Sequence, residues 1–160
     1  MSEREQKAHT IVRKYMYLSM GSGLLPIPFV DLALVSGVQL KMLADISNIY
    51  KVPFKDNIGK AVIGSWIGFA GPQAMACGAF PYVLKSIPVV GYLVGGPIMV
   101  VLCGAYSWAL GNTFIQHFES GGTFLNFDSD KVKEYFQAQF ELGKKVAATM
   151  KAERKGGGQA

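Results

Sequence analysis

The sequence is organised around residues 61–84, AVIGSWIGFAGPQAMACGAFPYVL, a run of 24 residues without a charged side chain. After a single lysine, Lys85, a second charge-free run extends over residues 86–116. A helix needs about 20 apolar residues to cross the hydrocarbon core of a bilayer, so each run is long enough. We therefore predict an all-α, membrane-associated helical bundle with a transmembrane hairpin, whose spans cover about 58–84 and 88–118.

The charged residues lie almost entirely outside these runs. Of the 16 Lys and Arg residues, 15 lie outside and Lys85 lies between the two runs, and the chain has a net charge of +5. Bacterial inner-membrane proteins keep Lys and Arg on the cytoplasmic side. We therefore expect the protein to lie in the bacterial inner membrane with both termini in the cytoplasm. Bases near the membrane ends favour anionic lipid headgroups. A nucleic-acid partner is not expected, because the bases are not clustered with stacking aromatics.

Amphipathic helices are expected on both sides of the hairpin. Apolar residues recur every three or four positions over residues 3–20, 28–50 and 130–152, which is the pattern of a helix with one apolar face. The first of these helices either lies on the membrane surface or packs against the second. We therefore expect one helical membrane domain over 1–155, followed by a disordered tail over 156–160.

Glycine and proline mark a helix start and a set of packing positions. Gly23, Pro26 and Pro28 break the chain before the second helix, and Pro28 suits the first position of that helix. Asp31 follows in the first turn, where a carboxylate meets the positive end of the helix dipole. In the predicted spans, small residues four apart allow two helices to approach closely in lipid. These packing positions are Gly64, Gly68, Gly91 and Gly95.

Residues outside the spans supply candidates for contact with a protein partner. Lys41 and Asp45 lie one turn apart on the second helix and can pair on a solvated face. The last helix carries an apolar stripe, which needs a partner from the same chain, a second copy or another protein. The partner-facing candidates are Gln39, Lys41, Asp45, Tyr135, Phe136 and Phe140.

The sequence contains no recognisable catalytic constellation. A phosphate-binding loop ends in Gly-Lys-Ser/Thr, which residues 21–23 lack. His9 and His117 are far apart, and neither has the spacing of a zinc site or a catalytic neighbour. Cys77 and Cys103 fall one in each apolar run, where thiols behave as small apolar groups. We therefore expect a protein that is not an enzyme and binds neither metal nor cofactor.

Several short segments resemble one bacterial family. They are Gly23-Leu-Leu-Pro-Ile-Pro-Phe-Val-Asp31, Gln39-Leu-Lys-Met-Leu43, Val52-Pro53, Ile87-Pro88 and residues 118–127 with Gly121-Gly122. Over about residues 8–140, the chain resembles the bacterial domain-of-unknown-function family 697, which occurs alone or joined to Era-like small GTPase domains. The resemblance implies a helical, membrane-associated domain connected with a small GTPase, and it implies no reaction.

Two functions fit these observations. The first is a non-enzymatic docking, scaffold or regulatory module in the inner membrane, which binds a small GTPase or forms a homo-oligomer. The second is an oligomeric channel or a membrane-remodelling protein, although the spans lack the ionisable residues that ion pathways usually expose. A soluble bundle that buries the apolar hairpin as its core also remains open.

Overall fold

The computed structural model describes residues 1–22, 28–55, 57–62 and 90–156. Within this part of the chain, the backbone forms helices and loops and no strand, so the prediction of an all-α fold is confirmed. A short helical segment covers residues 57–62. The long helices are α1 (Glu3–Ser22), α2 (Pro28–Tyr50), α5 (Val90–Glu119) and α6 (Ser129–Gly156).

Local capping groups explain where these helices begin and end. At the start of α1, the Ser2 backbone N–H donates to Glu5 Oε2 and the Glu5 N–H donates to Ser2 Oγ, each at 3.1 Å. This reciprocal pair is a capping box. After α5, Gly121 has a φ of 82°, a left-handed conformation that glycine adopts without strain. The Gly122 N–H then donates to the His117 carbonyl at 2.9 Å, which satisfies one of the last carbonyls of the helix.

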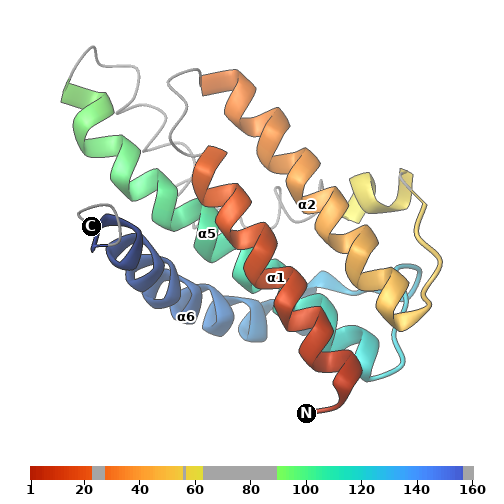
Figure 1. Ribbon diagram of the computed structural model, residues 1–160. Coiled ribbons are helices and arrows are strands. Elements are labelled where there is room, and N and C mark those ends of the chain that lie inside the picture. The colour runs from red at the N-terminus through yellow and green to blue at the C-terminus, as the bar shows by residue number, and fades with distance from the viewer. Residues whose placement is uncertain (23–27, 56, 63–89, 157–160) are drawn as a thin grey trace.

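Helix α5 is the central element of the bundle. It packs against α1, α2 and α6, and α1 also packs against α2 (Figure 1). In Figure 1, α2 runs in the same general direction as α5, whereas α1 and α6 run in the opposite direction. Three helices therefore cover the middle and the C-terminal part of α5.

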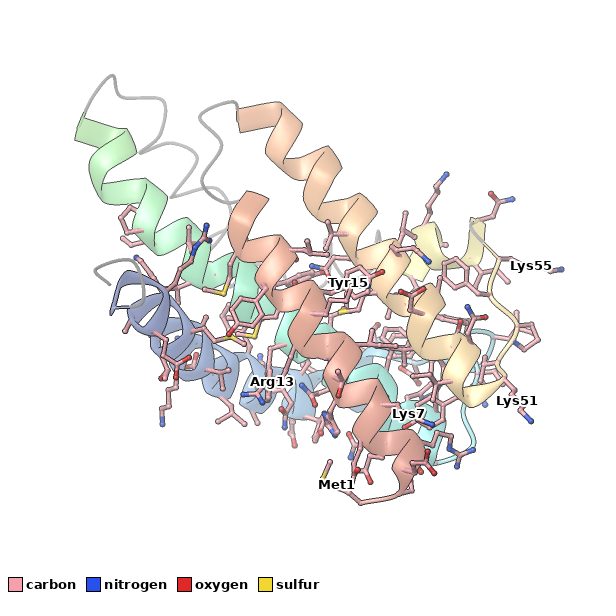
Figure 2. All side chains as sticks on the ribbon, in the orientation of Figure 1. Met1, Lys7, Arg13, Tyr15, Lys51 and Lys55 are labelled. Carbon is pink, nitrogen blue, oxygen red and sulfur yellow. The ribbon has the colours of Figure 1, made fainter. Side chains whose placement is uncertain are left out.

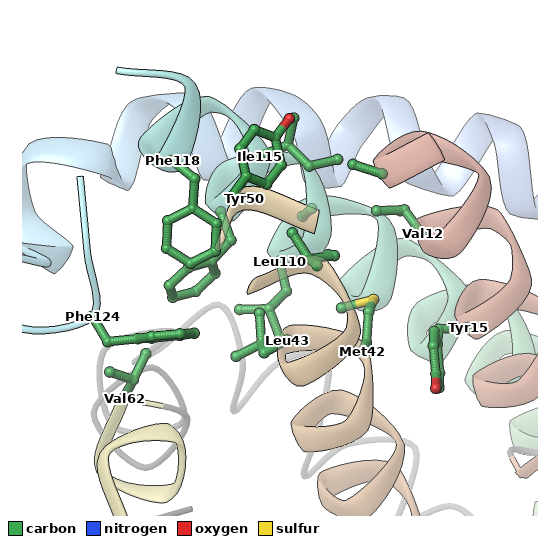
Figure 3. Close-up of a cluster of buried hydrophobic side chains, with 14 of the residues drawn as sticks. Val12, Tyr15, Met42, Leu43, Tyr50, Val62, Leu110, Ile115, Phe118 and Phe124 are labelled. Carbon is green, nitrogen blue, oxygen red and sulfur yellow. The ribbon is translucent and has the colours of Figure 1, made fainter. Parts of the chain in front are cut away.

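Buried apolar side chains hold this arrangement together. Figure 3 shows the larger cluster, in which Leu110 of α5 lies among side chains of α1 and α2. Phe114 of α5 is fully buried, and its ring stacks on Phe127 of the following loop with 4.6 Å between ring centroids. A second cluster contains Met16 and Met20 of α1, Val100 of α5, and Ala147 and Met150 of α6.

The region predicted as the second membrane span is a helix packed inside this bundle. Residues 88–118 correspond closely to α5, so the helix itself is confirmed. As a span, the prediction is wrong, because no helix among the described residues has both the length and the apolar character needed to cross a bilayer. Ala109, Leu110 and Phe114 are instead fully buried against neighbouring helices. A charge-free run is typical of a central bundle helix as well as of a membrane helix.

The region predicted as the first span, 58–84, lies outside the described residues from residue 63 onward. The short helix over 57–62 contributes Val62 to the larger apolar cluster. The predicted tail, 156–160, also lies outside the described residues apart from Gly156, the last residue of α6. The single domain over 1–155 stays a prediction.

Two glycines allow close contacts between helices. A Cβ atom at Gly111 of α5 would lie 2.5 Å from Val12 Cγ2 on α1. A Cβ atom at Gly143 of α6 would lie 2.9 Å from the backbone carbonyl oxygen of Ala105 on α5, and a backbone atom cannot rotate out of the way. Position 143 must therefore lack a side chain for α5 and α6 to approach this closely.

We expect Gly143→Ala to lower the free energy of unfolding by about 1–2 kcal/mol, because overpacking outweighs the better helix propensity of alanine. Gly37 of α2 is the matched control, since a Cβ atom added there meets nothing within 4 Å. Gly37→Ala should raise the free energy of unfolding by up to about 1 kcal/mol. Urea unfolding followed by circular dichroism measures both, and equal stability of the two variants would contradict the close α5–α6 contact.

Candidate functional site

The described structure places only part of the predicted helix-start motif and packing positions. Gly23 and Pro26 lie outside the described residues, and Pro28 begins α2 as predicted. Asp31 falls in the first turn of α2, but its side chain lies outside the described residues. Among the four predicted packing glycines, Gly64 and Gly68 are outside the described residues, and Gly91 and Gly95 fall where only the α5 backbone is described.

Gln39, expected to face a partner, is instead fully buried between three helices. Its Nε2 donates to Ser107 Oγ of α5 at 2.6 Å and lies 3.3 Å from Ser19 Oγ of α1. Ser107 Oγ is also 2.6 Å from Ser19 Oγ. Each of α1, α2 and α5 therefore contributes one polar side chain to a buried cluster, which we call the Gln39 cluster and define as Ser19, Gln39 and Ser107.

The burial of Gln39 follows from its position in the helical repeat. Met42, Leu43 and Ile46 lie three, four and seven residues further along α2 and are all fully buried, so Gln39 belongs to the same apolar face. Its Oε1 atom has no hydrogen-bond partner among the described residues. An unsatisfied buried acceptor costs about 1–3 kcal/mol. The Gln39 cluster thus joins three helices and leaves one buried acceptor without a partner in the described part of the chain.

Lys41 and Asp45 pair as predicted, and the structure adds a third group from α1. Lys41 Nζ lies 2.6 Å from Asp45 Oδ1, and the Tyr15 hydroxyl donates to Asp45 Oδ2 at 2.6 Å. Figure 2 shows Tyr15 on the side of α1 that faces α2. Burial works against the charged form of Asp45, but the hydrogen bonds from Lys41 and Tyr15 outweigh it and lower the pKa of Asp45. Asp45 therefore stays charged and joins α1 to α2.

A second tyrosine forms a similar link at the other end of the α1–α2 contact. The Tyr50 hydroxyl donates to Glu119 Oε1 of α5 at 2.7 Å. Arg4 Nε of α1 lies 3.8 Å from the same oxygen, and the Arg4 guanidinium lies 5.0 Å from the centre of the Tyr50 ring. Burial and the bond to Glu119 raise the pKa of Tyr50, and burial and the bond to Asp45 raise the pKa of Tyr15. Both tyrosines therefore act as proton donors in hydrogen bonds and not as bases.

The candidates on α6 divide between the core and the surface. Phe136, expected to face a partner, is buried at 7% exposure and meets the Tyr106 ring of α5 edge to face at 5.9 Å. Phe140 is half-buried and packs against the larger apolar cluster. Tyr135 is half-buried, and burial raises its pKa. The apolar stripe of α6 is thus partnered largely by α5 of the same chain.

The described histidines make local contacts with their own helix or the loop that follows it. No group of three or more His, Cys, Asp or Glu side chains within the described ranges is placed to hold a metal ion. His117 Nε2 lies 2.9 Å from the Thr123 carbonyl oxygen, which gives it a structural contact. His9 lies 3.9 Å from Glu5 on the same helix. Ser19, Ser107 and Glu119 were not predicted from the sequence, whereas the place of Gln39 on the apolar stripe of α2 was an available signal of its burial.

Comparison with known proteins identifies a family and a relative. A family model described as a domain of unknown function, DUF697, matches residues 1–145 of the chain. Magnetosome membrane protein 22 of Magnetospirillum gryphiswaldense is 32% identical over 155 residues, which cover 94% of this chain and 77% of that protein. No solved structure is significantly similar to the chain.

We expect Gln39→Glu to destabilise the protein in a pH-dependent way. A carboxylate in the Gln39 cluster would be buried without a cation, so its folded pKa would lie above the ordinary value of about 4.3. The added cost should therefore be small at about pH 4 and grow to about 3 kcal/mol or more at about pH 7.5. Gln116→Glu, on the exposed side of α5, is the control and should show no such trend. Denaturant unfolding at both pH values provides the measurement.

Tyr15→Phe should remove one hydrogen bond to a charged partner and cost about 1–2 kcal/mol at pH 7. The pKa of Asp45 is lowered in the folded protein, so the stability gained from its charged form is present above the unfolded pKa of about 3.9 and is lost as pH falls through the lower folded pKa. The cost of the substitution should therefore shrink below about pH 4. Tyr17→Phe, at an exposed tyrosine, is the control. A pH-independent cost would show that the Tyr15 hydroxyl does not depend on charged Asp45.

Proposed function

Because the chain belongs to the DUF697 family of domains of unknown function, we propose that it is a non-enzymatic, membrane-associated helical module that holds a protein partner at the bacterial inner membrane. The observation that carries the proposal is the relative that matches 94% of the chain and is named a membrane protein. The charge-free run over 61–84 supplies the apolar residues that such an association needs. Both termini are expected on the cytoplasmic side, where most of the bases lie.

The contacts of the described polar side chains support a docking role over catalysis. The buried side chains of the Gln39 cluster, and the pairs Tyr15–Asp45 and Tyr50–Glu119, all join one helix to another. Groups used in this way stabilise a rigid platform and are not available to a substrate. We propose a small GTPase as the partner, on the basis of the family resemblance, and Lys41 and Tyr135 as contact residues because they remain at least partly exposed.

Membrane association is tested by alkaline carbonate extraction of cell membranes followed by blotting. We expect the wild-type chain to stay in the membrane pellet. Ala70→Arg should increase release, since an arginine within an apolar segment costs about 2.5–3.5 kcal/mol at the centre of a membrane helix. Ala138→Arg, at an exposed position of α6, is the control and should behave as wild type. Complete release of the wild-type chain would overturn the proposal.

The docking role needs a separate experiment. The full chain is solubilised in mild detergent and used to capture purified small GTPases of the same bacterium, loaded with either GDP or a GTP analogue. We expect capture that Lys41→Glu with Tyr135→Ala weakens, while Lys131→Glu with Gln137→Ala does not. Ion flux through vesicles that contain the protein, without any GTPase capture, would instead favour the channel.

A further inference from the structure

The outer face of α1 combines bases with exposed apolar side chains. Arg13 and Lys14 are exposed, and Tyr17 and Leu18 are 49% and 50% exposed. At about 100° per residue, these four side chains fall within an arc of roughly 140°, so they form one continuous patch. The opposite face of α1, which carries Met16, is buried against the bundle. We call these four residues the α1 patch.

The bases of the α1 patch are exposed, and Lys14 acts on an acid only through longer-range electrostatics that help to lower the pKa of Asp45. Arg4 and Lys7, nearer the start of α1, pair with Glu119 and Glu3. Within the described part of the chain, Arg13 and Lys14 form no ion pair, and Lys14 Nζ lies 5.4 Å from the Tyr15 ring centre. Two basic side chains are therefore exposed next to each other on this face of α1.

The α1 patch also lies towards the end of the bundle at which α5 begins. Met16 and Met20 pack in one cluster with Val100 of α5, and α5 begins at Val90, shortly after the charge-free residues 61–84. At the same end, Ile98 is 46% exposed and Lys151 of α6 donates to the Pro97 carbonyl at 3.1 Å. Bases and exposed apolar side chains thus gather near the start of α5, the helix that follows the charge-free run.

We infer that the α1 patch is a contact surface for anionic lipid headgroups, with Arg13 and Lys14 binding phosphates while Tyr17 and Leu18 enter the boundary between headgroups and acyl chains. This inference rests on the proposed membrane association and deepens it by assigning one surface to the lipid. A tyrosine ring suits this depth because it is apolar along its body and polar at its tip. Each base near an anionic surface contributes about 1 kcal/mol, so the pair provides both binding and a preference for acidic lipids.

The test places a photo-crosslinking amino acid at Leu18 of the full chain, reconstituted in phosphatidylcholine vesicles with or without phosphatidylglycerol. We expect a crosslink to phospholipid that is stronger when phosphatidylglycerol is present. Arg13→Gln with Lys14→Gln should reduce it at least about fivefold. Lys51→Gln with Lys55→Gln is the matched control, since it removes the same charge from the segment that follows α2 and should leave the crosslink unchanged (Figure 2).

Flotation of the same samples separates this inference from the proposed function. If the protein floats with the vesicles but position 18 crosslinks to a second copy or to no lipid, the α1 patch is not the lipid surface and membrane association still holds. The inference is also overturned if the yield of the lipid crosslink changes neither with phosphatidylglycerol nor with the Arg13→Gln and Lys14→Gln substitutions. If the protein does not float with any vesicle, both proposals fail. Circular dichroism of each variant tests whether these exposed substitutions leave the helices intact.

Discussion

The bundle depends on one constraint, which is that α5 must be covered by three other helices along its middle and C-terminal part. This helix carries no charged side chain until Glu119 at its end, and water is a poor solvent for such a surface. Phe114 and Leu110 are removed from water by α1, α2 and the loop that follows α5. The close approach of α6 at Gly143 and of α1 at Gly111 completes the coverage. Burial of α5 therefore sets the positions of the other elements.

Polar residues within α5 are compatible with this burial because the helix itself supplies partners. Asn112 Nδ2 donates to the Trp108 carbonyl and Thr113 Oγ1 to the Ala109 carbonyl, both at 2.8 Å. Such bonds to the preceding turn satisfy short polar side chains without a second helix. Ser107 differs, because besides its bond to the Cys103 carbonyl it also contacts Gln39 of α2 and Ser19 of α1. Some buried polar side chains in this protein thus bond only within their own helix. Others bond between helices and fix the helices relative to each other.

Predictions from the sequence were accurate where the interactions are local and inaccurate where they join distant parts of the chain. The starts of α1 and α2 were predicted closely, since Ser2 with Glu5 and the position of Pro28 act within one helical turn. The contacts of Gln39 and Phe136 were not predicted, because the burial of these side chains depends on residues such as Ser107 and Tyr106, which are distant in the sequence. Lys41 and Asp45 were paired correctly, but the third member, Tyr15, lies 30 residues away on another helix.

The sequence by itself determined that the described part of the chain is helical, where its helices begin to within about two residues, and where charge is absent. Those properties depend on hydrogen bonds and periodicities within a few residues, which are the same whatever surrounds the helix. Only the tertiary structure decided what shields the apolar residues of α5 from water. It placed them against α1, α2 and α6. A run of apolar side chains is stabilised equally well by lipid or by protein, so its destination depends on contacts that a linear pattern does not contain.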